Sequence, residues 1–479
     1  MPARSWIFLI CCLLLTLVAV HSPSFPAVAA EPPVDSIIRA SVGNDGRQAN
    51  NQSLQPALSA DGRYIAFASL ASNVVSAESF GWDWDLFVHD RTAGTTERAV
   101  SALDGAEPNG FVTYPALSAD GRYVAFQSSA TNLVDWDENG YTDVFVTDRA
   151  TDRTIRVSEA SDGTPGNYDS ENPAISGDGR YVAFRSGADS LAPGTTGIAY
   201  FDVFVHDVVT RQTSRVSIAS DGSEGRLCSQ TGLCGTSTPP AISADGRYVA
   251  FESAWNDLVP NDTNAAPDIF VHDRVAHHTV RISQASDGQQ PNNFSYDPAI
   301  SADGRYVAFY SYATNLSPGD TNGQADVFVH DRHTQITTRV TRSTTGTPAD
   351  GESFSPSLSA DGRRVAFWSD ASNLVATEAP RACIYAFPAN GQCYDVYVHD
   401  RVTGQTARLS DATDGTQSNG YSQAPIISSD GQHVAFSSAA SNLIPGDTNE
   451  YEDIFVYSQT VPPSAPPRNI YIPMLRLNR

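Results

Sequence analysis

Short runs of alternating apolar and polar residues recur along this chain, separated by turn-forming residues. The clearest run reads PAISADGRYVAF at residues 240–251 and again at 298–309. Close variants begin at Pro56, Pro115, Pro173, Pro356 and Pro425. Apolar–polar alternation over a few residues is typical of half-buried β-strands, and no stretch shows sustained helical periodicity. The pattern therefore predicts seven copies of one β-structured unit.

Each unit contains four expected strands. The letters PAIS predict the first strand, and YVAFxS predicts the second strand after the turn ADGR. Asp-Gly between apolar runs is a hairpin signal, because glycine tolerates the positive φ that a tight turn needs. A polar loop then leads to DVFVHDR, a third strand rich in β-branched and aromatic residues. A turn such as VTGQT precedes the fourth strand, which reads ARLS or IRVS.

The spacing of the units indicates how they assemble. The phenylalanine of YVAFxS recurs at intervals of 59, 58, 67, 58, 58 and 69 residues. Seven four-stranded units without helices predict an all-β, seven-bladed β-propeller over residues 31–460, because radial repetition protects sheet edges. A lone strand at Ser36–Val42 precedes the first unit, and the last unit ends after its third strand, Glu452–Ser458. We expect the N-terminal strand to complete the last blade and close the ring, which avoids an unpaired edge.

The combination of SADGRYVAF and DVFVHDR resembles the WD40-like PD40 repeat of TolB-type β-propellers, from about Ser36 to Ser458. This resemblance implies the propeller fold and is weak as a guide to function. TolB itself is a periplasmic protein with an α/β domain ahead of its propeller, and it binds a peptidoglycan-associated lipoprotein. We expect no counterpart of that domain here, so the role of TolB is not carried over to this chain.

The chain ends predict export. A charged start at Arg4, an apolar run over Trp6–Val20 and the small residues before position 31 are typical of a secretory signal peptide over residues 1–30. We expect a secreted, cell-surface or periplasmic monomer without an integral membrane segment after cleavage. The sequence of residues 461–479 predicts a Pro-rich linker followed by a short C-terminal tail.

The charge balance excludes several classes of partner and chemistry. The formal net charge is −24, with 54 acidic and 30 basic residues, and none of the basic residues is a lysine. Nucleic acids would be repelled, because their binding rests largely on phosphate neutralisation. A lysine Schiff base and a phosphate-loop lysine are excluded because the chain has no lysine.

The cysteines predict two local disulfides. The two long repeat intervals contain the insertions CSQTGLC and CIYAFPANGQC, and exported proteins meet an oxidising compartment. We expect Cys228 to pair with Cys234 and Cys383 with Cys393, the simplest of three connectivities. Crossed pairs or free thiols remain the alternative.

The repeated His-Asp sequence raises the question of catalysis. Histidine precedes aspartate at one repeat position in five units, at His89, His206, His272, His330 and His399. Such a pair could act as a base with its orienting carboxylate. An active site needs one asymmetric constellation, so five copies favour a structural hydrogen bond. The arginine of each fourth strand takes the same structural interpretation, at Arg39, Arg98, Arg156, Arg215, Arg281, Arg339 and Arg408. No G-x-S-x-G motif occurs, and we predict no catalytic residue.

Four loops carry the pattern D-x-N-x-x-x-D, which predicts a metal site. The residues are Asp137, Asn139 and Asp143; Asp262, Asn264 and Asp268; Asp320, Asn322 and Asp326; and Asp447, Asn449 and Asp453. Alternating oxygen ligands are typical of calcium loops, although the glutamate of such loops is missing. Asp and Asn also cap turns through their own side chains, which is the alternative interpretation. Ca²⁺ is the one cofactor that the sequence suggests.

The long loops are expected on one face, which we call the loop face, opposite the hairpin turns on the turn face. Most unrepeated aromatic residues lie in these loops: Trp82, Trp84, Trp136, Trp255, Phe294, Tyr296, Tyr385 and Tyr421. Exposed aromatic side chains beside Asp and Asn suit sugar stacking or a protein contact, although they could also only cover the blade ends.

The leading hypothesis for function is an exported, non-enzymatic binding or scaffold propeller. Its loop face would recognise a protein or a cell-envelope glycan, because binding residues tend to lie on loops over a rigid scaffold. The alternative is a polysaccharide-acting lyase or hydrolase with acids in the central pocket. Unrepeated acid, Arg and His residues converging on the funnel would favour the enzyme, and a flat aromatic surface would favour binding.

Overall fold

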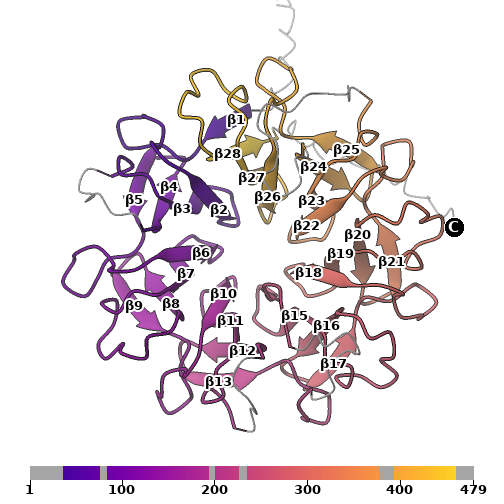
Figure 1. Cartoon of the computed structure of the whole chain (residues 1–479), viewed down its shortest axis with the longest axis horizontal. Helices are drawn as coiled ribbons and strands as arrows, with labels where there is room; N and C mark the ends of the chain where they lie inside the picture. Colours follow the sequence, from indigo (N-terminus) through magenta and orange to yellow (C-terminus); the bar gives the residue numbers. More distant parts are fainter. Residues whose placement is uncertain (1–35, 76–82, 194–199, 226–234, 377–392, 460–479) are drawn as a thin grey trace, which may run out of the picture. The chain divides into compact units, whose positions relative to one another are not determined.

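A computed structural model describes residues 36–75, 83–193, 200–225, 235–376 and 393–459. These residues form seven four-stranded antiparallel sheets arranged in a ring around a central opening (Figure 1). The predicted seven-bladed propeller is therefore confirmed. In the described part of the chain there is no helix, and hence none that could span a membrane.

The strands follow one order in every blade, with the first strand innermost. Blades 1 and 2 contain β2 (Ser53–Leu58), β3 (Tyr64–Ser69), β4 (Asp85–Asp90) and β5 (Thr95–Arg98), then β6 (Val112–Leu117), β7 (Tyr123–Ser128), β8 (Asp143–Asp148) and β9 (Arg153–Arg156). Blades 3 and 4 contain β10 (Ser170–Ile175), β11 (Tyr181–Ser186), β12 (Asp202–Asp207) and β13 (Gln212–Arg215), then β14 (Ala241–Ile242), β15 (Tyr248–Ser253), β16 (Asp268–Asp273) and β17 (His278–Arg281).

The remaining blades repeat this arrangement. Blades 5 and 6 contain β18 (Ser295–Ile300), β19 (Tyr306–Ser311), β20 (Asp326–Asp331) and β21 (Ile336–Arg339), then β22 (Ser353–Leu358), β23 (Arg364–Ser369), β24 (Asp395–Asp400) and β25 (Gln405–Arg408). Blade 7 contains β26 (Ser422–Ile427), β27 (His433–Ser438), β28 (Asp453–Ser458) and, from the other end of the sequence, β1 (Ser36–Arg39).

Strand β1 closes the ring as the sequence predicts. It pairs antiparallel with β28, with Ser36 opposite Ser458 and Arg39 opposite Phe455. The Arg39 guanidinium lies 3.2 Å from Asp447 and 3.4 Å from Asp453, and all three side chains are buried. The last blade is thus held by hydrogen bonds and by buried ion pairs between distant parts of the sequence.

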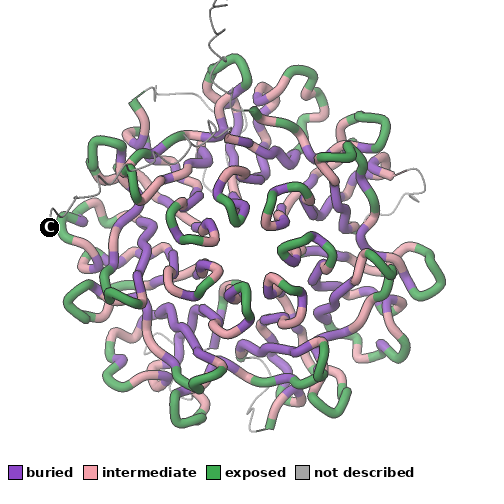
Figure 2. The backbone as a smooth tube through the Cα atoms, turned by 180° about the vertical axis from the view of Figure 1, so that it is seen from behind, coloured by how far each residue is buried: buried purple, intermediate pink, exposed green. Residues whose placement is uncertain are grey.

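The hydrophobic core is divided into seven clusters, each between neighbouring blades. Ala66 and Val88 of blade 1 pack with Val112 and Phe126 of blade 2, and equivalent clusters follow around the ring. Burial runs along the strands, while exposed residues lie in the turns and peripheral loops (Figure 2). Each blade therefore depends on its neighbours for its apolar contacts.

The hairpin turns of all seven blades are joined by a closed circle of backbone hydrogen bonds on the turn face. In each turn one small residue donates its N–H to the carbonyl of the corresponding residue in the next blade. The bonds run from Ala60 to Ala119, then Gly177, Ala244, Ala302, Ala360, Ser429 and back to Ala60, at 2.8–3.0 Å. We call this set the turn ring. Its close approach explains why this repeat position holds only Ala, Gly or Ser.

The glycine of the ADGR turn meets two requirements. Gly121 of blade 2 has φ 69°, and a Cβ at this position would lie 2.4 Å from the ring of Tyr64 in blade 1. Arg149 of blade 2 covers the same tyrosine ring, with its guanidinium carbon 4.7 Å from the ring centroid. The repeated letters D-G-R-Y thus encode both the turn and the contact between neighbouring blades.

Removing β1 tests the closure of the ring. Deleting residues 31–42 should lower the free energy of unfolding by at least about 3 kcal/mol, because Asp447 and Asp453 lose their buried partner Arg39. Chemical denaturation monitored by tryptophan fluorescence measures the change. A synthetic peptide of residues 36–43 should restore part of the loss. Unchanged stability after the deletion would contradict closure by β1.

Candidate functional site

The innermost strands carry a strained residue at the central opening in six of the seven blades. Each of these residues has a positive φ between 43° and 57° and immediately precedes the repeat proline: Gln55, Tyr114, Asn172, Asp297, Ser355 and Ala424. A β-bulge occurs at this point in each of the six strands. None of these residues is glycine, and non-glycine residues held in this conformation tend to cluster at functional sites.

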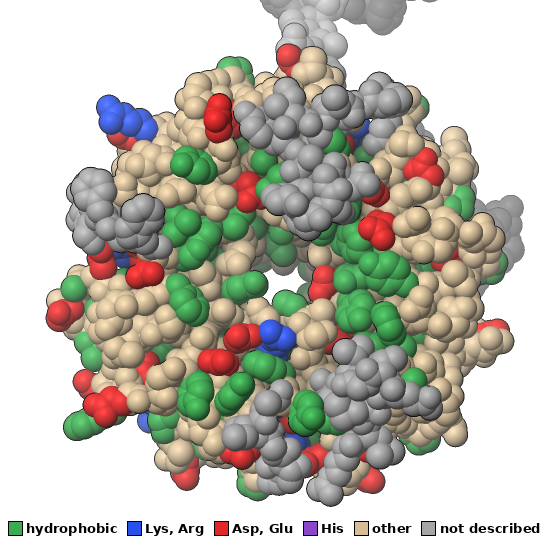
Figure 3. Space-filling model, in the orientation of Figure 1, with side chains coloured by type: hydrophobic (Ala, Val, Ile, Leu, Met, Phe, Trp, Pro, Cys, Tyr) green, Lys and Arg blue, Asp and Glu red, His purple; other side chains and the backbone are tan. Residues whose placement is uncertain are grey.

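These residues line a cavity on the propeller axis. It has a volume of about 530 Å³, and half of its lining residues are prolines, one from each blade: Pro56, Pro115, Pro173, Pro239, Pro298, Pro356 and Pro425. In the space-filling view the opening is surrounded by hydrophobic and acidic side chains, with a basic side chain at one edge (Figure 3). We call this cavity and the side chains around its mouth on the loop face the funnel.

Next to the strained residues, six of the seven blades place a pair of side chains opposite one another on their first and second strands. Apart from these positions and the strained residues, the first three strands agree closely between repeats, but here every blade differs. The pairs are Leu54 with Ala68, Thr113 with Gln127, Glu171 with Arg185, Tyr296 with Tyr310, Phe354 with Trp368, and Gln423 with Ser437. In blade 4 the second-strand position holds Glu252. The funnel is therefore chemically asymmetric on a symmetric scaffold.

Blades 5 and 6 form an aromatic wall. The rings of Tyr296 and Tyr310 lie 5.6 Å apart, Tyr310 contacts Phe354 at 5.2 Å, and Phe354 contacts Trp368 at 5.0 Å between centroids. Tyr394 supports Trp368 from below with an edge contact at 4.5 Å and is itself fully buried. The other four rings are half-buried.

Blade 3 contributes an ion pair to the same region. The Arg185 guanidinium donates to Glu171 at 2.6 Å and lies over the ring of Phe201 at 4.6 Å. It also donates to the carbonyl of Ser237 at 2.9 Å and so reaches blade 4. Arg185 is therefore held on three sides.

Two carboxyl groups lie between the ion pair and the aromatic wall. Glu252 is buried and accepts hydrogen bonds from the Ser237 N–H at 2.6 Å and the Thr238 N–H at 3.2 Å, and burial raises its pKa to about 7. Asp297 lines the axial cavity and accepts from the Ser355 hydroxyl at 2.8 Å. Burial raises the pKa of Asp297 as well. Each carboxyl group is in an environment that disfavours its negative charge.

The sequence contains a signal for the funnel that our sequence analysis did not use. The residue after the repeat phenylalanine, written x in YVAFxS, is the second-strand member of each pair. The residue before the repeat proline is the strained one. Both positions vary inside otherwise uniform strands, and this contrast could have located the site.

The predicted loop-face aromatics fall into different environments. Tyr296 belongs to the aromatic wall, and Trp136 is 85% exposed in the loop between β7 and β8. Trp84 is half-buried. Trp255 and Tyr421 are only 6% and 7% exposed, which corrects the expectation that they are surface aromatics. Trp82 and Tyr385 lie outside the described residues.

The repeated His-Asp sequence has the structural role that we inferred. His206 Nδ1 lies 2.9 Å from the Thr213 hydroxyl on the neighbouring strand, and the same contact occurs in all five blades that carry the histidine. The adjacent Asp207 instead accepts two hydrogen bonds from Arg180, at 3.0 and 2.7 Å. The two side chains have separate partners and do not form a catalytic pair.

The D-x-N-x-x-x-D loops bring their two carboxylates together around a fourth-strand arginine. In blade 5 the Arg339 guanidinium lies 3.5 Å from Asp320 and 3.3 Å from Asp326. Asn322 donates to the carbonyl of Ala349 and accepts from the N–H of Gln324. The same arrangement surrounds Arg39, Arg156 and Arg281. The arginine is a cation of the protein itself at the position where the sequence suggested calcium.

The three blades without the pattern provide the second carboxylate from elsewhere. Arg98 pairs with Glu107 at 2.7 Å, and Arg215 pairs with Glu224 at 2.9 Å. Arg408 pairs with Asp411 at 2.7 Å, and in all three blades the third-strand aspartate lies 3.5–3.9 Å from the arginine. Every fourth-strand arginine thus has two acidic partners, which indicates that the pattern serves to neutralise this charge.

The calcium interpretation stays a prediction, with the arginines as competing cations. No group of three or more His, Cys, Asp or Glu side chains in the described ranges is arranged to hold a metal ion. The two disulfides also stay predictions, because Cys228, Cys234 and Cys383 lie outside the described residues and only Cys393 lies within them.

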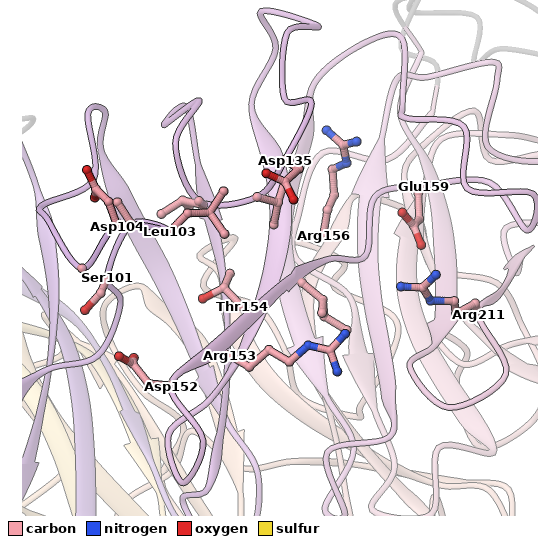
Figure 4. A pocket seen from close by; sticks show the side chains of 15 residues that line it. Ser101, Leu103, Asp104, Asp135, Asp152, Arg153, Thr154, Arg156, Glu159 and Arg211 are labelled. Atoms are coloured by element: carbon pink, nitrogen blue, oxygen red, sulfur yellow. The ribbon is translucent and has the colours of Figure 1, made fainter.

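A second cavity lies at the outer edge beside the fourth strand of blade 2, between the connecting segments that precede and follow this blade. This rim groove has a volume of about 700 Å³ and is lined by Leu103, Asp135, Arg153 and Glu159 among others (Figure 4). At five other junctions a polar side chain of the connecting segment accepts from the N–H of a fourth-strand threonine: Asn44, Ser161, Ser220, Ser286 and Thr344. In the rim groove the equivalent position is held by Leu103, whose side chain cannot accept a hydrogen bond. Leu103 is 61% exposed.

Comparisons with known proteins agree with the fold. No protein-family model matches the chain, and no curated protein matches it in sequence. TolB from Acinetobacter baumannii is 16% identical over 60% of this chain and 53% of its own length, with a TM-score of 0.34. The chain thus aligns with about half of that protein.

Enzymes resemble the chain to a similar degree. An oligogalacturonate lyase in complex with manganese is 13% identical over 90% of this chain and 97% of its own, with a TM-score of 0.49. An acylaminoacyl peptidase from Pyrococcus horikoshii is 10% identical over 82% and 49%, with a TM-score of 0.46. Such likeness concerns the propeller fold alone and carries no argument about function.

Replacing a fourth-strand arginine tests its role as the internal cation. Arg339→Met should cost about 3–5 kcal/mol of stability, because it leaves two buried carboxylates unpaired. Arg153→Met, on the exposed surface of β9, is the matched control and should change stability little. Equal stability of the two variants would refute the assignment.

Calcium can be tested on the same proteins. If the guanidinium groups neutralise the carboxylates of the D-x-N-x-x-x-D loops, the wild-type melting curve should be the same in millimolar calcium and in EDTA. Stabilisation of the wild type by calcium, but not by magnesium, would instead establish the calcium interpretation.

The rim groove predicts a stabilising substitution. Leu103→Ser would supply the acceptor that five other junctions have and should raise stability by about 0.5–1.5 kcal/mol. Leu103→Ala is the control, since it removes the exposed apolar side chain without adding an acceptor. A gain shared by both variants would show that the missing hydrogen bond is irrelevant.

Proposed function

We propose that this protein is an exported binding propeller that recognises a protein or cell-envelope partner at the funnel. The observation that carries this proposal is the contrast between uniform strands and the varied pairs at the funnel mouth. Packing alone would accept the same residues in every blade, as it does at the neighbouring phenylalanine. Within the three inner strands the side chains differ chiefly around one opening, as recognition of a single asymmetric ligand requires.

The aromatic wall gives the funnel its binding chemistry. Tyr296, Tyr310, Phe354 and Trp368 are preassembled by contacts with one another, so a ligand would not have to order them. Preorganised aromatic side chains on a rigid scaffold carry much of the energy in many interfaces. The strained residues that line the axial cavity also hold their backbone in a fixed conformation.

A specific observation also favours a second candidate, a polysaccharide-acting lyase or hydrolase. Acidic and basic side chains that are not repeated between blades converge on the funnel, as an enzyme would require. They are Glu171, Glu252, Asp297 and the basic residue Arg185. A carboxyl group with a pKa of about 7 could transfer protons near neutral pH. Glu252 is, however, already engaged by hydrogen bonds from Ser237 and Thr238. That arrangement suits a fixed charge better than a mobile proton donor.

A binding screen against glycans and cell-envelope proteins tests the leading proposal. Trp368→Ala should weaken capture of the best ligand by at least about 30-fold, the effect of truncating an aromatic hot spot. Trp136→Ala is the matched control, because Trp136 is exposed in a loop outside the aromatic wall. Binding that depends on Trp136 and not on Trp368 would place the site elsewhere.

The same screen separates the two candidates. If a retained glycan is shortened during incubation and Glu252→Gln stops the cleavage while binding persists, the enzyme hypothesis is correct. Binding of an intact ligand by both the wild type and Glu252→Gln supports a recognition role.

A further inference from the structure

The carboxyl groups of the funnel differ from the other buried acids described above. Around the rim of the propeller, each fourth-strand arginine neutralises two acidic side chains, in all seven blades. Glu252 and Asp297 have no ion-pair partner among the residues that the structure describes. The nearby basic residue, Arg185, forms an ion pair with Glu171. The funnel therefore combines carboxyl groups that lack an ion-pair partner in the described ranges with an open cavity.

Asp297 is the member of this pair that a ligand can reach. It lines the axial cavity, and its backbone has φ 50°, which fixes its side chain at the opening. The Ser355 hydroxyl holds one carboxylate oxygen at 2.8 Å. Glu252 is buried behind the mouth and held by N–H donors. The charge of Asp297 adds to the rise in the pKa of Glu252 that burial causes, and the charge of Glu252 adds in the same way to the rise in the pKa of Tyr296 and Tyr310.

The surroundings of these acids suit a positive group on an apolar stem. Aromatic faces attract cations, and Tyr310 lies close enough to Asp297 and Glu252, and Tyr296 to Glu252, for these acids to add to the effect of burial in raising the pKa of the tyrosines. The seven prolines of the cavity have no N–H to donate. An unbranched aliphatic side chain can pack against these prolines without leaving a hydrogen-bonding group unpaired.

We infer that the funnel binds a lysine side chain of a protein partner, with its ammonium group at Asp297 and its stem between the aromatic wall and the prolines. This inference rests on the proposed function, because it names the partner chemistry of the same site. The net charge of −24 would steer a basic segment toward the protein. The chain contains no lysine of its own, so the group must come from another molecule.

The test compares probes that differ in charge but hardly in shape. Binding of a lysine hexapeptide is measured by calorimetry beside a hexapeptide of Nε-acetyl-lysine. A glucosamine hexamer forms the third arm and represents an amino sugar. We expect the lysine peptide to bind at least about tenfold more tightly than either other probe, which equals 1.4 kcal/mol.

Conservative variants locate the interaction. Asp297→Asn removes the charge while keeping a residue that tolerates positive φ and can still accept from Ser355, so it should fold normally. The substitution should weaken binding of the lysine peptide by at least about tenfold and leave binding of the acetylated peptide unchanged. Glu138→Gln, an exposed acid in the loop between β7 and β8, is the control for the loss of one charge and should have no effect.

The pH dependence gives an independent readout. The pKa of Glu252 is about 7, and Asp297, Tyr296 and Tyr310 face it, while Arg185 reaches the adjoining carbonyl of Ser237. A cation favours the ionised carboxylate, and lysine stays charged throughout this range. Affinity should therefore rise from pH 5.5 to pH 8 in the wild type, and the rise should flatten in Glu252→Gln.

The outcomes separate the inference from the proposed function. Equal binding of the lysine and acetyl-lysine peptides, lost in Trp368→Ala, would overturn the charge assignment while the funnel remained a binding site. Tighter binding of the glucosamine hexamer would assign the site to an amino sugar and overturn the protein partner. Failure of all three probes would also overturn the inference. The proposed function itself is contradicted only if the ligand from the envelope screen binds Trp368→Ala as tightly as it binds the wild type.

Discussion

The turn ring is the constraint on which the rest of this structure depends. Seven backbone hydrogen bonds form a closed circle that joins the innermost hairpins, so each blade has one fixed neighbour on either side. A circle of this kind closes only if every blade has the same turn at the same radius. The repeated letters S-A-D-G-R are the sequence requirement of that circle: a small residue where turns meet, and a glycine against which the preceding blade packs its tyrosine.

Because the turn end of each innermost strand is fixed, the opposite end can vary without loss of the fold. This end holds the strained residues, the varied pairs and the axial cavity. The bulge before each proline releases the strand from regular pairing where it reaches the opening. Backbone strain at this end is offset by the cooperative packing of blade against blade. One strand thus serves the scaffold at one end and recognition at the other.

Most of the fold could be predicted from the sequence, because its determinants are local and repeated seven times. The ring closure by Ser36–Arg39 followed from counting strands at the two ends. The funnel was harder to find, because Glu252, Arg185 and Trp368 share only the variable position of YVAFxS, and Asp297 occupies the variable position before the repeat proline. Only the radial geometry brings them together. The repeated aspartates attracted a metal interpretation because their partner, the fourth-strand arginine, lies on another strand and reaches the loop only in the folded blade.

Hydrogen exchange resolved to single amides tests most directly whether one end of each innermost strand is fixed and the other is adaptable. The account predicts that the turn-ring amides of Ala119, Ala302 and Ala360 exchange only through global unfolding, although these turns lie at the surface. Amides of the loop-face segments before the same strands should exchange faster through local opening and become protected when the ligand of the funnel is added. Fast exchange in the turn ring, or ligand protection confined to the rim groove, would contradict the account.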